Sequence, residues 1–192
     1  MEILSLNEIK KIIGGELIRG EGDAQVTGIS IDSRKIKPGE LFWAIPGERY
    51  DGHDFVLEAL SKGAAGAVIS RKDLTHNTYL EPYHFQTLIL VPNTLPALQT
   101  LAQVYRKRFP IPLIAVTGSN GKTSTKEIIA QVLSTRVKVL KTEGNFNNLI
   151  GLPLSLVGLS SQHQVAVLEM GMNRSGEIAR LCEIAQPNIG VI

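Results

Sequence analysis

A glycine-rich turn between an apolar segment and an amphipathic one constrains this chain more than any other feature. Residues 113–117 predict a buried strand, and residues 122–134 have the apolar spacing of a helix. The backbone N–H groups of such a turn and the following helix amino terminus favour anions. The pattern predicts a nucleotide phosphate loop with these candidate residues: Gly118, Ser119, Asn120, Gly121, Lys122, Thr123 and Ser124.

Two side chains of this loop have chemical roles in the prediction. Lys122 is expected to act in catalysis, because its ammonium can reach the β and γ phosphates, and the Thr123 hydroxyl can bind Mg²⁺. The usual pattern has a glycine five residues before Gly121, but Val116 stands there, so the loop is a variant. The competing interpretation is an ordinary glycine turn. The coincidence of strand, lysine, hydroxyls and helix favours phosphoryl transfer.

The order of the expected elements predicts an α/β fold. After the loop, strands alternate with helices, which indicates a parallel sheet with right-handed crossovers. A smaller α/β segment precedes it, opened by a capping box at Ser5 and Glu8. We therefore expect a small mixed α/β domain at residues 1–92 and a parallel-sheet, ATPase-like domain at residues 93–192. The sequence stops within an expected strand, so we expect this second domain to be truncated.

Composition excludes several classes of protein. The 20 basic and 18 acidic residues are scattered, without the basic run that would follow a nucleic-acid backbone. No stretch approaches the roughly 20 apolar residues of a membrane helix. Cys182 is the only cysteine, which excludes a disulfide framework within the chain and fits a reducing cytoplasm. We expect no nucleic-acid partner and no membrane insertion.

Polar residues at other predicted strand ends are further candidates. Glu169 ends an apolar strand, where ligands of open parallel sheets gather, and its carboxylate could hold Mg²⁺ near Thr123. The alternative is an ion pair with a lysine. Ser33 and Arg34 offer a hydroxyl and a fork of donors to a uridine or diphosphate. Their alternative is a surface ion pair, or an Asx-type turn begun by Asp32.

Several short sequence motifs resemble motifs of the Mur ligase family. Residues 117–124 resemble the ATP loop of these ligases and of their folylpolyglutamate synthetase relatives. Residues 144–153, and 169–173 followed by 176–178, resemble the family member that adds D-alanyl-D-alanine. Residues 31–34, 38–42 and 51–55 resemble the UDP-MurNAc-binding domain of that family. The resemblance covers essentially the whole chain.

The resemblance implies an ATP-dependent amide-bond ligase of peptidoglycan precursor synthesis. Such an enzyme joins D-alanyl-D-alanine to UDP-MurNAc-tripeptide through an acyl phosphate, with ATP and Mg²⁺, as a cytoplasmic monomer. Glu169 would bind the metal beside Thr123. Substrate would be bound by Ile31, Ser33, Arg34, Glu48, Arg49, Tyr50, Asn145, Asn147 and Asn148. The asparagines have an alternative role in turning the loop and capping a helix.

Other functions remain open at this stage. Family members carry a third domain that this sequence lacks, so we expect the chain by itself not to turn over. Another ligase of the superfamily, such as the diaminopimelate- or lysine-adding enzyme or a folylpolyglutamate synthetase, is the main alternative. A non-catalytic module that binds a UDP-sugar or nucleotide is a second. A GTPase-type switch is disfavoured, because the sequence has no convincing Asn-Lys-x-Asp word.

Overall fold

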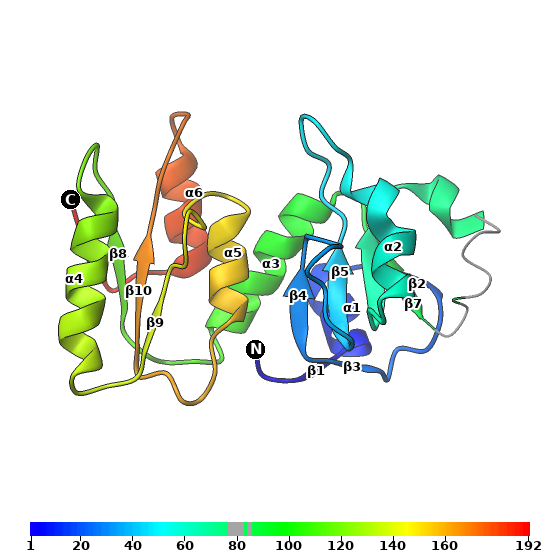
Figure 1. Cartoon of the computed structure of the whole chain (residues 1–192), viewed down its shortest axis with the longest axis horizontal. Helices are drawn as coiled ribbons and strands as arrows, with labels where there is room; N and C mark the ends of the chain where they lie inside the picture. Colours follow the sequence, from blue (N-terminus) through cyan, green and yellow to red (C-terminus); the bar gives the residue numbers. More distant parts are fainter. Residues whose placement is uncertain (77–82, 84–85) are drawn as a thin grey trace. The chain divides into compact units, whose positions relative to one another are not determined.

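The chain forms two compact units in a computed structural model that describes residues 1–76, 83 and 86–192. The first unit is Glu2–Leu98 and the second is Gln99–Ile192. The boundary falls inside helix α3 (Thr94–Arg106). Both units are α/β, as the sequence predicts (Figure 1).

A five-stranded sheet forms the centre of the first unit, in the order β2-β7-β6-β5-β4. Strands β4 to β7 pair in parallel, and β2 joins the edge antiparallel to β7. A separate antiparallel pair is made by β1 and β3. The elements are β1 (Leu4–Ser5), α1 (Leu6–Ile13), β2 (Glu16–Arg19), β3 (Gln25–Val26), β4 (Gly28–Ser30), β5 (Glu40–Trp43), η1 (Gly52–Phe55), α2 (Val56–Ser61), β6 (Gly66–Ile69), η2 (Lys72–His76) and β7 (Thr87–Leu90).

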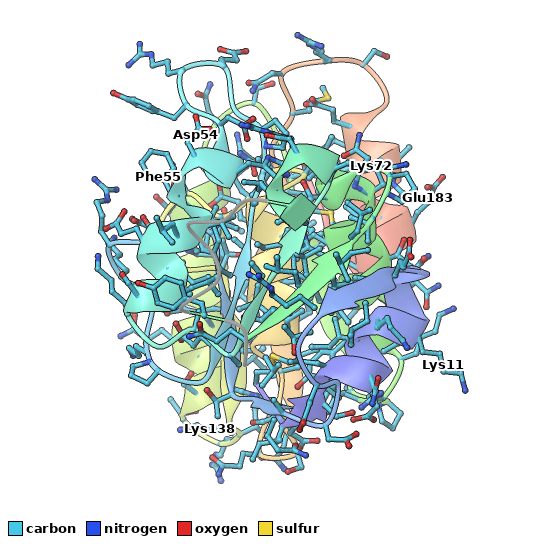
Figure 2. The ribbon with its side chains drawn as sticks, turned by 90° about the vertical axis from the view of Figure 1, so that its right-hand side faces the viewer. Lys11, Asp54, Phe55, Lys72, Lys138 and Glu183 are labelled. Carbon is cyan, nitrogen blue, oxygen red and sulfur yellow. The ribbon has the colours of Figure 1, made fainter. Side chains whose placement is uncertain are left out.

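Helix α1 shows how local sequence sets an element. The Ser5 hydroxyl accepts a bond from the Glu8 amide, and the Glu8 carboxylate accepts one from the Ser5 amide, so the predicted capping box is confirmed. The helix ends at Gly14, whose φ of 63° is the left-handed conformation that glycine adopts without strain. Leu6 and Ile9 are buried, while Lys11 extends outward from the helix (Figure 2).

The core of the first unit lies between α2 and the sheet. Val56 and Leu60 of α2 share one buried cluster with Phe42 and Ile69 of the strands. Burying side chains of this size contributes roughly 1.5–3 kcal/mol each. Trp43 is fully buried, and its indole N–H donates to the Thr94 carbonyl at 2.7 Å. This packing fixes the end of β5, from which the loop before η1 departs.

The second unit is built on a four-stranded parallel sheet in the order β11-β8-β10-β9. Figure 1 shows α4 on one face of this sheet and α5 and α6 on the other. The predicted parallel sheet is therefore confirmed. The remaining elements are β8 (Leu113–Val116), α4 (Lys122–Ser134), β9 (Val139–Lys141), α5 (Gly151–Val157), β10 (Val165–Glu169), α6 (Glu177–Ala185) and β11 (Ile189–Val191).

Some expected elements differ in detail from those observed. The apolar pattern of residues 26–31 predicts one strand, but the strand is interrupted at Thr27 between β3 and β4. The helical spacing that starts at Asp54 predicts a helix there, but a 3₁₀ turn begins at Gly52, because the Asp51 carboxylate accepts a bond from the His53 amide. The polar residues 72–86 predict a loop, which contains η2; residues 77–82 and 84–85 lie outside the described part. Strand β2 was not predicted, since its pairing with β7 spans some seventy residues.

No helix within the described ranges combines the length and the apolar character that crossing a bilayer requires.

Candidate functional site

The glycine-rich loop joins the carboxyl end of β8 to the amino end of α4. Gly118 and Gly121 have φ angles of 135° and 78°, which side-chain-bearing residues adopt only with strain. Gly121 is the residue that caps α4, and it supplies no side-chain bond to the first turn. The amide groups of that turn are thus directed at a ligand site, as in other anion-binding helix termini.

Lys122 arches back over this loop. Its ammonium donates to the Gly118 carbonyl at 2.8 Å and lies 3.5 Å from the Ser119 carbonyl. The side chain is half-buried, so the charge is held at the mouth of the loop rather than extended into solvent. Ser119, Asn120, Thr123 and Ser124 are exposed. The structure thus brings all seven predicted loop residues to one edge of the sheet.

Glu169 lies beside this loop because β10 pairs with β8 and places Glu169 opposite Val116. The Thr123 hydroxyl donates to one oxygen of the Glu169 carboxylate at 2.9 Å. The side-chain amide of Asn147 donates to the other oxygen at 2.8 Å. The Glu169 residue is only 3% exposed. Residues from three separate segments therefore meet at this carboxylate.

The donor set around Glu169 fits a Mg²⁺ ion. Throughout the described part of the chain, no lysine, arginine or histidine lies within ion-pair distance of Glu169, so the alternative of a lysine pair is not found. A carboxylate and a hydroxyl are hard oxygen donors, and Mg²⁺ usually takes few protein ligands beside water and phosphate oxygens. The described ranges contain no cluster of three or more His, Cys, Asp or Glu that could hold a metal.

The three asparagines before α5 have different surroundings. Asn147 contacts Glu169, as described above. The Asn148 side chain accepts bonds from the Ile150 and Gly151 amides at 3.0 and 2.9 Å, which is the loop-turning role considered as its alternative. The residue that caps α5 is Ile150. Asn145 has an exposed side chain, and its carbonyl accepts from the Asn147 amide at 2.8 Å. Among the described hydrogen bonds of these three residues, the side-chain bond of Asn147 is the one that reaches Glu169.

A second candidate site is a cavity of about 650 Å³ in the first unit. Of the predicted residues, four line it: Ile31, Ser33, Arg34 and Tyr50. Glu48 and Arg49 are exposed on the loop that carries Tyr50 but are not among the lining residues. Phe55 and Glu58 line it also and were missed as site residues. Phe55 lies within residues 51–55, which resemble the UDP-MurNAc-binding domain, whereas Glu58 had no sequence signal that indicates a ligand.

Glu58 organises the polar floor of this cavity. The buried Ser33 hydroxyl donates to one Glu58 oxygen at 2.7 Å. The Lys62 ammonium donates to the other oxygen at 2.6 Å and to the Ser33 carbonyl at 3.0 Å. The bonds from Lys62 and then Ser33 lower the pKa of the Glu58 carboxyl. Three residues from two segments are thereby tied together.

Arg34 and Asp32 form the charged rim. The guanidinium donates to both Asp32 oxygens, at 2.8 and 2.9 Å, and the Arg34 amide donates to the same carboxylate at 3.0 Å. The surface ion pair and Asx-type turn considered from sequence are therefore both present. The side-chain bond from Arg34 is the largest influence that lowers the pKa of Asp32 to about 2. The Arg34 side chain remains 80% exposed, so its outer face is available to an anion.

His53 anchors the loop that carries Tyr50. The buried imidazole lies with Nδ1 2.6 Å from an Asp51 oxygen, and its Nε2 accepts from the Ser70 amide at 2.8 Å. The second bond requires a lone pair on Nε2, so the proton is assigned to Nδ1. Pro46 and Asp51 form a bridge across the base of the loop. His53 therefore has a structural role here.

The strand, variant loop and helix place the second unit in the class of phosphate-loop α/β folds. The chain belongs to the Mur ligase family: the family model described as the Mur ligase middle domain matches residues 116–192, and the one described as the Mur ligase family, catalytic domain, matches residues 25–106. Both candidate sites lie within these matched ranges.

Curated relatives are UDP-N-acetylmuramoyl-tripeptide--D-alanyl-D-alanine ligases. That of Bacillus subtilis is 41% identical over 98% of this chain and 40% of its own length. That of Synechocystis is 44% identical over 88% of this chain and 36% of its own length. The chain thus spans about 40% of the length of the curated relatives it matches.

Solved structures of MurF ligases also resemble this chain. A MurF crystal structure from Acinetobacter baumannii has a TM-score of 0.89 and 32% identity, covering 99% of this chain and 40% of that one. MurF ligase from Thermotoga maritima, solved in complex with ADP, has a TM-score of 0.71 and 38% identity, covering 83% of this chain and 35% of that one.

Proposed function

We propose that this chain supplies the ATP-binding and UDP-substrate-binding parts of a ligase that joins D-alanyl-D-alanine to UDP-MurNAc-tripeptide. The observation that carries the proposal is the meeting of Lys122, Thr123 and Glu169 at one sheet edge, with 2.9 Å between the Thr123 hydroxyl and the Glu169 carboxylate. The names of the relatives, one of which is 44% identical over the matched residues, support the choice of substrates.

The proposed reaction has two steps. The γ-phosphoryl group of ATP passes to the terminal carboxylate of the tripeptide, which gives an acyl phosphate and ADP. The amine of D-alanyl-D-alanine then attacks the acyl carbon, forms the amide and releases phosphate. Protein groups contribute mainly position and charge stabilisation to such a transfer.

Each loop residue has a defined task in the first step. The amides of Gly118 to Ser124 hold phosphate oxygens, and Lys122 exchanges its bond to the Gly118 carbonyl for one to the transferred group. Thr123 and Glu169 would hold Mg²⁺, which neutralises charge on the β and γ phosphates when bound. Asn147 keeps the Glu169 carboxylate turned toward Thr123, because it occupies the opposite oxygen.

We assign the UDP-MurNAc moiety to the cavity of the first unit, within residues 1–92. The exposed face of Arg34 suits a diphosphate, since a guanidinium makes two parallel bonds to phosphate oxygens. Ile31 provides an apolar contact and Tyr50 a planar aromatic ring for a uracil base. Glu48, Arg49, Asn145 and Asn148 stay in the proposal as peripheral substrate contacts. Residues 93–192 hold ATP.

Two broader properties complete the proposal. The single cysteine and the family's precursor substrates support a cytoplasmic location. The resemblance to the Mur ligases supports a monomer, for which sedimentation of the purified chain is the direct measurement.

The experiment measures phosphate release and amide formation in the same assay, with the protein as its host organism produces it. The proposal requires one phosphate per amide, with release dependent on ATP, UDP-MurNAc-tripeptide and D-alanyl-D-alanine together. Turnover with UDP-MurNAc-dipeptide and diaminopimelate or lysine instead would identify another ligase of the family. Binding of the UDP substrate without any ATP turnover would indicate a non-catalytic module.

A further inference from the structure

Hydrogen bonds of side-chain and main-chain groups link four polar residues of the second unit into a closed ring that includes the first turn of α4. Thr123 and Lys126 lie on α4, one turn apart, while Thr142 follows β9 and Glu169 ends β10. The Thr123 hydroxyl donates to the Glu169 carboxylate at 2.9 Å. The Glu169 amide donates to the Thr142 hydroxyl at 2.9 Å. The Lys126 ammonium donates to the Thr142 carbonyl at 2.8 Å, which returns the ring to α4.

Burial makes this ring unusual. Lys126, Thr142 and Glu169 are 1%, 0% and 3% exposed, although lysine and glutamate rarely leave the solvent. A buried ammonium is costly unless it is paired and hydrogen-bonded. Lys126 meets this condition through the Thr142 carbonyl and through a Glu127 oxygen at 2.8 Å. The second Glu127 oxygen accepts from Lys141 at 2.6 Å.

The ring contacts both the side chain and the main chain of Glu169. The Glu169 carboxylate is hydrogen-bonded by Thr123 and Asn147, and the Glu169 main-chain amide by the Thr142 hydroxyl. Thr142 is in turn linked to α4, because its carbonyl accepts a bond from Lys126. Thr142 is also tied to the sheet, since its own amide donates to the Val167 carbonyl.

We propose that Thr142 and Lys126 are positioning residues that set the separation between the Thr123 hydroxyl and the Glu169 carboxylate, and thereby the affinity for a divalent cation with the nucleotide. This inference rests on the proposed ATP site and deepens it. Neither residue touches the ligand. Each acts through Glu169, whose position relative to α4 changes when either bond is lost.

The experiment compares Thr142→Val with Thr142→Ser by calorimetric titration with ADP, once with Mg²⁺ and once with a chelator. Valine keeps the shape of threonine and removes the hydroxyl, whereas serine keeps the hydroxyl. In Thr142→Val the Mg²⁺-dependent gain in ADP affinity should fall about threefold to tenfold, as expected for one lost hydrogen bond. Thr142→Ser should restore most of that gain.

Lys126→Met provides an independent arm, because methionine fills much of the same space without the ammonium. It should lower the Mg²⁺-dependent gain in the same direction. The double variant with Thr142→Val should lose less than the two single losses combined, since both changes break one ring. Thermal unfolding without ligand shows whether each variant is folded.

The outcomes separate this inference from the proposed function. If the unmodified chain binds ADP more tightly with Mg²⁺ and Thr142→Val keeps the full gain, the positioning role is wrong while the nucleotide site stands. Equal losses with and without Mg²⁺ would also overturn it, because they would show general support of the loop. If the unmodified chain binds ADP under neither condition, both proposals fail.

Discussion

The two candidate sites of this molecule are built in opposite ways. At the nucleotide loop, one run of residues, 118–124, supplies main-chain amides at a helix start, and two positive φ angles shape it. The cavity of the first unit is formed by side chains from separate segments: the Ser33 hydroxyl is hydrogen-bonded to Glu58, which lies 25 residues further along the chain. A local site depends on backbone conformation and a few charges, whereas a non-local site depends on the packing of α2 against the sheet.

The largest effect is expected from loss of the loop ammonium. Lys122→Met removes a charged donor without changing the backbone, so affinity for Mg·ADP should fall about tenfold to a hundredfold, the range for hydrogen bonds to charged groups. UDP-substrate affinity should stay unchanged. Calorimetric titration with both ligands checks this. Lys138→Met is the matched control, because Lys138 is exposed and precedes β9 at the other end of the strand. Equal Mg·ADP affinity of the two variants would show that Lys122 does not contribute to the site.

The next effect concerns the fold that supports the cavity. His53→Ala leaves the Asp51 carboxylate and the Ser70 amide without their imidazole partner. Unfolding in urea should show a loss of about 1–2 kcal/mol, the lower part of the range for unsatisfied polar groups, because Asp51 and Ser70 are partly exposed. Affinity for Mg·ADP should change little. A variant as stable as the original chain would show that His53 does not anchor the Tyr50 loop.

A smaller effect is expected from the cavity floor. Ser33→Ala removes the donor to the Glu58 carboxylate at 2.7 Å. Because Glu58 is partly exposed and keeps its bond from Lys62, we expect only about a threefold to tenfold change in affinity. Titration with UDP-MurNAc-tripeptide measures it. Lys35→Met serves as the control, because Lys35 is exposed nearby and does not line the cavity. If Ser33→Ala lowers only the stability of the fold and leaves the affinity unchanged, the Ser33–Glu58 bond does not support substrate binding.

The smallest effect is a pH dependence of the cavity rim. Arg34 holds the pKa of Asp32 at about 2, below its ordinary 3.8. A carboxyl with a lowered folded-state pKa stabilises the fold above its ordinary pKa, and this contribution is lost as the pH falls through about 2. Melting temperatures between pH 5 and 2 should therefore fall less steeply for Asp32→Asn than for the original chain. The difference should be small, because exposed ion pairs contribute little. Parallel curves would show that the pair does not couple to folding.

The same contrast explains what could be predicted from sequence. The loop at residues 118–124 was readable because its glycines, Lys122 and the flanking elements are contiguous. Glu169 was readable because an apolar strand ends there and parallel strands share a carboxyl edge. Glu58 was not readable, because only tertiary packing brings α2 to Ser33. Thr142 and Lys126 were missed for the same reason, since nothing local distinguishes a buried lysine from a solvated one.

We propose that the two units bind different ligands: a nucleotide at the loop and a UDP substrate in the cavity. The most direct test is a residue-resolved NMR titration of the labelled chain, first with Mg·ADP and then with UDP-MurNAc-tripeptide. Mg·ADP is expected to shift the amide signals of residues 118–124 and 169, and the UDP substrate those of residues 31–34 and 50–58. Shifts of residues 118–124 by the UDP substrate, with residues 31–34 unchanged, would contradict it.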